Sequence, residues 1–250
     1  MNQSVFFYLG ILIAFLGFNQ ATFSQTTSQK AVWYGYFFTV PIDSNWYTVT
    51  EIQERHQVDP FSQNQFLVRG RLHRSLGESW DSSTGMSLFL HHRIARLDNE
   101  DFEWPERRPH LDATFKTKIF KVPIEQRIRT EARFYKNLDL ETGLPDEGYF
   151  FRAFRYRYRI QATISIAEFS NGKSLRLKFA DEIMGMSAGE VGALRFDQNR
   201  ISGDLNFYLS RDLILEVGYL YWHQKRESGA FLDQHILRTV VRHRLDFSKK

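Results

Sequence analysis

The strongest constraint on the fold of this chain is a strict alternation of side-chain character over residues 124–135. Even positions carry Ile124, Gln126, Ile128, Thr130, Ala132 and Phe134, and odd positions carry Glu125, Arg127, Arg129, Glu131, Arg133 and Tyr135. A period of two places these sets on opposite faces of a β-strand. On a helix the same charges would surround the axis, so the segment is predicted to be a strand.

The same period recurs along the rest of the chain. In residues 154–165, apolar and aromatic side chains alternate with three arginines and three uncharged polar residues. About eleven such segments can be distinguished, starting near residues 31, 45, 62, 82, 108, 122, 150, 173, 198, 213 and 232. No helical periodicity competes with them after the first residues. The predicted fold class is therefore all-β, as a single antiparallel barrel.

Alternation alone does not decide which face of the barrel is inside. A soluble barrel would bury the apolar face, whereas a transmembrane barrel would turn it toward lipid. The runs approach the about 9–11 residues that cross a bilayer, whereas strands of soluble proteins average about 5–6. Aromatic pairs such as Trp33-Tyr34 and Trp46-Tyr47 collect near run ends, as membrane-interface girdles require. These features favour a barrel in a cell outer membrane, with its lipid as a partner.

The first residues indicate export. An apolar run from Val5 to Phe18 has the length of a signal-peptide core, and small residues at Thr22 and Ser24 precede a cleavage point before Gln25. We expect a signal peptide over residues 1–24 and a barrel domain over residues 25–250. An uncleaved membrane anchor is the alternative, although the charges that flank such anchors are missing.

Composition excludes several functions. There is no cysteine, so disulfides, thiolate metal sites, thiol nucleophiles and a lipid-modified N-terminal cysteine are ruled out. The chain has 33 Lys and Arg against 29 Asp and Glu, and the basic residues are spread along it. A nucleic-acid partner is therefore not expected.

The connections between runs alternate in length. Short turns are expected at residues 43–45, 76–79, 120–122, 170–173 and 210–212, and longer loops at 98–108, 137–148, 182–197 and 225–229. In outer-membrane barrels the short turns are periplasmic and the long loops external. With eleven runs, this order of short and long connections would place the start of the first strand on the external side. Either one strand is therefore missed or the N-terminal segment threads the lumen. The expected strand number is about 10–12, with twelve favoured.

Several strings resemble a known family. They include residues 125–135, the Arg-Tyr-Arg run of 154–159, Asp181-Glu182, residues 198–200 and residues 215–221. On these the chain resembles an uncharacterised family of outer-membrane barrels common in Bacteroidetes, domain of unknown function 2490. The resemblance extends from about Trp33 to Phe247. It implies one barrel domain, and it assigns no activity and no catalytic residues.

The charged face of the runs is the candidate functional feature. If the apolar face meets lipid, a lumen charge cluster is expected from Arg69, Arg71, Glu125, Arg127, Arg129, Glu131, Arg133, Arg155, Arg157, Arg159, Arg200, Glu216, Arg242 and Arg244. Glu51, Asp181 and Asp204 are further acids expected there. Opposite charges on neighbouring strands can pair directly. The cluster would then be either an ion-paired plug that closes the lumen or a basic constriction that passes small anionic solutes.

An outer-membrane lipid-modifying enzyme is a third, weaker hypothesis. It would need a serine and a histidine side by side near the lipid boundary, and the candidates are His92, His243 and Ser87. No recognisable motif surrounds them, so the chain is not expected to be an enzyme. We expect no cofactor and no metal site, because the adjacent His91 and His92 would point to opposite faces of one strand. The sequence identifies no protein partner.

Overall fold

The alternating runs form eleven strands in the computed structural model, which describes residues 26–94, 101–139, 141–169, 171–187, 192–226 and 228–247. The predicted signal peptide lies outside these residues. The strands are β1 Thr26–Pro41, β2 Trp46–Val58, β3 Phe61–Leu76, β4 Trp80–Ile94, β5 Asp101–Ile119, β6 Val122–Leu138, β7 Pro145–Glu168, β8 Ser174–Ser187, β9 Leu194–Tyr208, β10 Leu213–Lys225 and β11 Phe231–Arg244. The all-β prediction is confirmed. Within the described part of the chain, no helix is long and apolar enough to cross a membrane.

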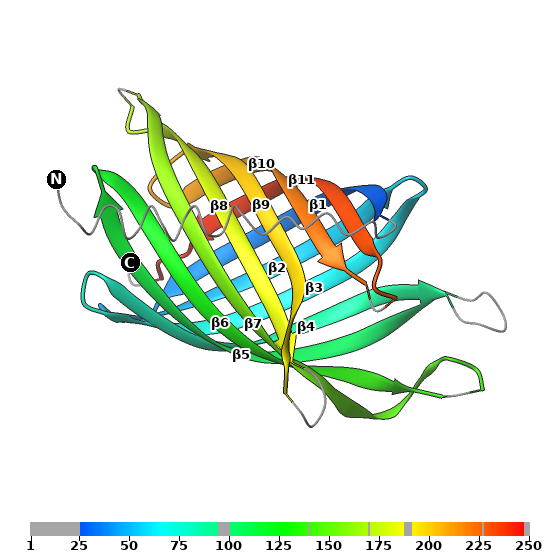
Figure 1. Ribbon diagram of the computed structural model, residues 1–250. Helices are drawn as coiled ribbons and strands as arrows, with labels where there is room; N and C mark the ends of the chain where they lie inside the picture. The colour runs from blue at the N-terminus through cyan, green and yellow to red at the C-terminus, as the bar shows by residue number, and fades with distance from the viewer. Residues whose placement is uncertain are drawn as a thin grey trace.

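Each strand pairs with its sequence neighbours, and the sheet closes on itself (Figure 1). All neighbouring pairs are antiparallel except the closing pair, in which β1 and β11 run in the same direction. Their parallel register extends from Thr26 opposite Phe231 to Thr39 opposite Arg244. An odd number of strands requires one such parallel pair, because the first and last strands then point the same way.

The favoured number of twelve strands is not found among the described residues, and the order of short and long connections is the one that eleven strands imply. Eleven strands lie within the expected range of 10–12, and the described residues contain no twelfth strand. The start of β1 lies at the end of the barrel that carries the longer connections, here called the long-loop end. The other end, called the short-turn end, carries the β1–β2, β3–β4, β5–β6, β7–β8 and β9–β10 turns. β1 therefore starts at the long-loop end, as the order of short and long connections predicts for eleven strands.

Two of the short turns show how local chemistry sets the hairpins. The carboxylate of Asp43 accepts hydrogen bonds from the backbone N–H groups of Asn45 and Trp46, both at 2.7 Å, which closes the β1–β2 turn. These backbone bonds hold the pKa of Asp43 below its ordinary value of 3.8. The β5–β6 turn is the residue pair Phe120 and Lys121, with φ of 46° and 72°. Positive φ at both positions suits the twist of a tight hairpin, although side chains other than glycine and asparagine rarely adopt it.

The barrel is inverted relative to a soluble protein. Among the described residues, twenty-seven buried side chains are polar or charged and twelve are hydrophobic. Large apolar side chains point outward instead, for example Leu111, which is 65% exposed, and Ile128, which is 59% exposed. The charged faces of the strands therefore line the interior, and the apolar faces form the outer surface.

The strands are longer than the sequence indicated. β5 begins at Asp101 and β8 continues to Ser187, so parts of the expected loops 98–108 and 182–197 are strand. β7 begins at Pro145, inside the expected loop 137–148. These extensions lie at the long-loop end and carry the lumen wall outward.

Candidate functional site

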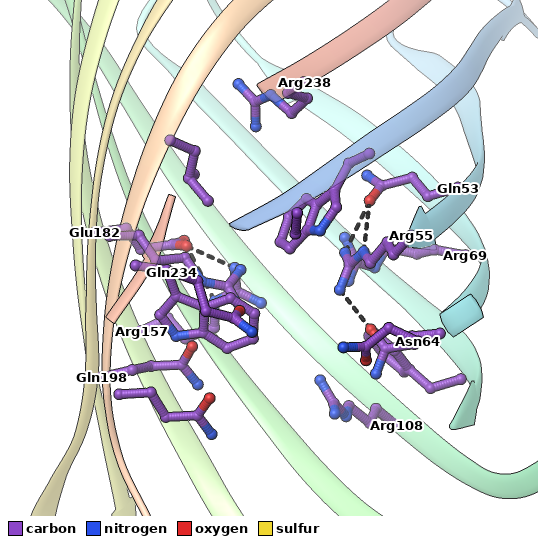
Figure 2. A pocket seen from close by; sticks show the side chains of 18 of the residues that line it. Gln53, Arg55, Asn64, Arg69, Arg108, Arg157, Glu182, Gln198, Gln234 and Arg238 are labelled. Atoms are coloured by element: carbon purple, nitrogen blue, oxygen red, sulfur yellow. Dashed lines mark hydrogen bonds and ion pairs between the residues drawn. The ribbon is translucent and has the colours of Figure 1, made fainter. Parts of the chain in front are cut away.

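The lumen contains a cavity of about 1250 Å³ that reaches the long-loop end and a second one of about 100 Å³ toward the short-turn end. The larger cavity has a strongly basic lining, with seventeen Arg or Lys side chains and six Asp or Glu side chains. Figure 2 shows part of it, with Arg55 and Arg108 on one side and Gln198 and Gln234 on the other. The lumen is thus an anion-attracting space.

The structure brings most of the expected charge cluster to this cavity. Eleven of the fourteen residues line it: Arg69, Arg71, Glu125, Arg127, Arg133, Arg155, Arg157, Arg159, Arg200, Glu216 and Arg242. Arg129 and Glu131 are completely buried in the wall behind it. Arg244 does not join the cluster. It is exposed at the short-turn end of β11, because the barrel wall ends there.

Glu106 on β5 is the centre of one group of charges. Its carboxylate is completely buried and lies 2.6 Å from Arg108, 2.6 Å from Arg133 and 2.7 Å from His91. One carboxylate thus serves two guanidinium groups and an imidazole from three neighbouring strands. The Glu106 carboxylate supplies the counter-charge that the two buried guanidinium groups need.

A second group forms a continuous chain of ion pairs across the wall. Arg129 contacts Asp112 at 2.5 Å and Glu131 at 3.6 Å, and Glu131 contacts Arg157 at 2.8 Å. Glu182 then receives both Arg157 and Arg127, each at 2.7 Å. The chain ties strands β5, β6, β7 and β8 together, and it fixes their register with charge-assisted hydrogen bonds.

A third group depends on a glycine. Arg238 on β11 reaches Asp204 on β9 at 2.6 Å, although β10 lies between these strands. The residue of β10 that faces both is Gly218, in register with Asp204 and with Arg238. A Cβ at this position would collide with the Asp204 carboxylate. The missing side chain therefore makes room for an ion pair that spans two strands.

The two cavities share a boundary. Four residues line both of them: Arg71, Glu125, Arg127 and Arg159. Arg159 contacts Glu125 at 2.5 Å, and Arg127 is held by Glu182. These four side chains, called here the closing layer, separate the large cavity from the short-turn end.

One wall of the lumen is apolar. Ala31, Trp33, Leu220 and Ile236, from β1, β10 and β11, form a buried cluster against which Trp222 packs. This wall coincides with the parallel seam between β1 and β11. Most of the lumen arginines lie on the remaining strands, and Arg238 and Arg242 lie on β11, so the lumen has one mainly apolar side and one basic side.

Arginine and aromatic side chains alternate where the two walls meet. The Arg55 guanidinium lies 3.9 Å from the Trp33 ring centre, and the Arg200 guanidinium lies 4.1 Å from that of Trp222. Arg108 covers Phe89 at 3.7 Å. Such cation–π contacts hold the guanidinium groups in place without neutralising their charge.

Sequence reasoning missed several lumen residues. Glu106, Arg108 and Glu182 fall in the expected loops, because the sequence pattern places the start of β5 too late and the end of β8 too early. Continuing the alternation of each strand identifies them, since Glu106 and Arg108 lie on the same face of β5 as Asp112. Asp181 was expected in the lumen and is not there. It lies on the outward face of β8, where it accepts a hydrogen bond from Asn199 Nδ2 at 2.6 Å.

The structure does not bring the candidate enzymatic pair together. Ser87 points into the lumen, where it accepts a hydrogen bond from Arg69 at 2.7 Å. His92 lies near the rim beside Glu103, and His243 pairs with the Tyr36 hydroxyl at 2.8 Å. In the described part of the chain, no three or more His, Asp or Glu side chains are grouped so that they could hold a metal ion.

Comparison with known proteins adds the family. No curated protein and no solved structure matches this chain. Residues 30–234 match the family described as "Protein of unknown function (DUF2490)". This match includes the nine strands from β2 to β10 in full, most of β1 and the first residues of β11. The chain therefore belongs to the DUF2490 family of proteins of unknown function.

Proposed function

We propose that this chain is an outer-membrane β-barrel protein whose lumen is closed by its own ion pairs. The observation that carries the proposal is the inverted barrel, with charge buried inside and large apolar side chains exposed outside. An aqueous environment would penalise such a surface, whereas lipid favours it. The family resemblance supports the same location, in the outer membrane of a Bacteroidetes-like bacterium. The predicted signal peptide would direct export.

The strand dimensions support this location. The strands have 13 to 24 residues, more than the about 9–11 that cross a bilayer at a tilt. Aromatic side chains also lie at both ends of the outer surface. Trp80 and Phe120 are exposed at the short-turn end, and Phe61 and Phe151 at the long-loop end. Two such girdles are typical of membrane barrels.

A cysteine-labelling experiment tests the membrane location. The chain has no native cysteine, so only the introduced thiol can react. Leu111→Cys and Ile128→Cys place a thiol on the outer apolar surface, and Glu78→Cys places one in the exposed β3–β4 turn. In membrane vesicles permeable to the reagent, we expect a water-soluble maleimide to label only the turn. A lipid-soluble maleimide should label the two outer-surface sites. Full aqueous labelling of Leu111→Cys in intact membranes would contradict the proposal.

The closing layer supports a lumen that does not conduct. Its four side chains separate the two cavities, and its members pair with Glu125 and Glu182. The full chain inserted in a planar bilayer should therefore give no steady current. The double variant Arg127→Ser with Arg159→Ser shortens two of these side chains and should raise conductance, while Arg244→Ser, outside the lumen, should not.

A second candidate function is an anion-selective pore, favoured by the excess of lining cations over acids. The same recording separates the two. Steady anion-selective current from the unmodified chain would replace the closed barrel with the pore. We propose no enzymatic activity, and lipid is the one partner that the outer surface supports.

A further inference from the structure

Where the apolar wall of the large cavity meets the basic wall, three polar atoms have no hydrogen-bond partner among the described residues. They are Nε of Arg200, Nε1 of Trp222 and Oε1 of Gln198. Arg200 and Trp222 are register partners on β9 and β10, and Gln198 lies two residues before Arg200. Neighbours of this kind have their Cβ atoms within about 8 Å of each other. The three atoms therefore form one group, and all three residues line the cavity.

Buried polar atoms without partners are rare, because each costs about 1–3 kcal/mol. Gln198 is only 1% exposed, and its free carbonyl oxygen cannot turn to bulk water at the surface. The other end of the same amide is already used, because Nε2 donates to Asp197. The group thus offers two donors and one acceptor to whatever occupies the cavity.

Two guanidinium groups in this part of the cavity are also less closely paired than their neighbours. Among the described residues, Arg200 and Arg55 form no ion pair with a carboxylate, whereas the neighbouring Arg155 and Arg157 do. Arg55 instead donates to the carbonyl oxygens of Gln53 and Gln65. Both guanidinium groups lie against tryptophan rings, which fixes them and leaves their charge available.

From these observations we propose that the large cavity is a binding site for an acidic saccharide. A carboxylate oxygen accepts from the two free donors, Arg200 Nε and Trp222 Nε1. An adjacent sugar hydroxyl donates to Gln198 Oε1. An anion without hydroxyl groups would leave the glutamine unsatisfied, and a neutral sugar would leave the arginine charge uncompensated.

The shape of the cavity fits this ligand class. A volume of about 1250 Å³ exceeds what a single sugar needs and accommodates a short chain of residues. The cavity is reached from the long-loop end, where Ser62, Asn64 and Gln224 add hydroxyl and amide groups to its lining. The closing layer blocks the other end, so the site retains its ligand. This binding does not depend on the membrane location and can be measured in detergent.

Three matched probes test the proposal on the full chain in micelles, by calorimetry and by tryptophan fluorescence, since Trp33, Trp104 and Trp222 line the cavity. They are a galacturonate trimer, a galactose trimer and propane-1,2,3-tricarboxylate. The first carries both charge and hydroxyls, the second only hydroxyls, and the third the same three charges without hydroxyls. We expect the galacturonate trimer to bind at least about tenfold more tightly than either other probe, because each lacks one of the required partners.

Two variants and one control locate the site. Arg200→Gln should weaken binding about 10- to 100-fold, as expected for a lost hydrogen bond to a charged group. Trp222→Phe keeps an aromatic ring and removes only the N–H donor, so it should weaken binding about 2- to 10-fold. Arg74→Gln is the control, because Arg74 covers Trp46 on the outer surface and should leave affinity unchanged.

Trp222→Phe also keeps the test decisive if Arg200→Gln does not fold. Binding of all three probes at equal strength, or of none, would overturn the proposal. Unchanged affinity in the folded Arg200→Gln or Trp222→Phe variant would overturn it as well. A galacturonate trimer that binds and loses affinity in these two variants alone would establish the site.

Discussion

Replacing Glu106 with Gln should destabilise the barrel more than almost any other single change. The substitution keeps the shape of the side chain and removes its negative charge. Two buried guanidinium groups, Arg108 and Arg133, then lose the counter-charge that lies 2.6 Å from each of them. In the described structure Glu106 is the sole carboxylate within ion-pair distance of either arginine.

The magnitude follows from this geometry. Breaking a buried ion pair by removing one partner costs about 3–5 kcal/mol, because the other charge is left uncompensated. Arg108 and Arg133 border the large cavity, where water reaches part of each group, and this reduces the cost. Arg133 also keeps a hydrogen bond to the Tyr135 hydroxyl. We therefore expect a loss of about 3 kcal/mol in the free energy of unfolding, at the lower end of that range.

Urea unfolding of the protein in micelles, followed by tryptophan fluorescence, measures this loss. Glu78→Gln in the exposed β3–β4 turn is the matched control and should change stability by less than about 1 kcal/mol. The double variant Glu106→Gln with Arg133→Gln should recover part of the loss, because one fewer cation remains without a counter-charge. A Glu106→Gln protein as stable as the control would refute the reasoning.

Three further predictions concern positions away from this carboxylate. Gly218→Val should lower stability by about 1–3 kcal/mol in urea unfolding, because a side chain there overlaps Asp204 and lies within 2.7 Å of the Gly203 carbonyl oxygen; an unchanged midpoint would show that β10 can shift freely. Replacing the Phe120-Lys121 pair with Asn-Gly should raise stability by about 1 kcal/mol or more, since both positions have positive φ, and an equal or lower midpoint would contradict this. Asp43→Ala should lower the urea midpoint at pH 7. The difference in midpoint between the variant and the unmodified chain should shrink as the pH falls below 3.8 through the lowered pKa of Asp43, because the protonated carboxyl no longer stabilises the turn. A difference that is constant down to pH 2 would argue against the two backbone hydrogen bonds.

The sequence predicted the strands well because a barrel strand has one simple signature. Residues 124–135 alternate without a break, and β6 contains all of them with the predicted face in the lumen. Each of the eleven segments that the alternation distinguishes corresponds to one strand. Period-two patterning depends on local sequence alone, so it can be recognised without knowing which strands pair.

Other features depend on contacts between strands, which the pattern along a single strand does not identify. The register of β8 shifts at a bulge between Met184 and Gly185, in the region expected to be a loop, and Glu182 was missed there. The ion pair between Arg238 and Asp204 spans two strands and needs the gap at Gly218, which no pattern along one strand reveals. The parallel closure likewise joins segments more than two hundred residues apart, such as Thr26 and Phe231.

The parallel pairing of β1 with β11 also affects the order in which the strands can pair and the ends at which inserted peptides would emerge. Antiparallel neighbours can be added one hairpin at a time, because each new strand folds back on the last through a short connection. The β1–β11 pair has no such connection, so it must form last, from the two segments that are farthest apart in the chain. Its two strands run in the same direction, so the start of β1 and the end of β11 lie at opposite ends of the barrel, and peptides inserted at these two positions would emerge at opposite ends. Epitopes at these two positions would therefore mark the two ends of the barrel separately.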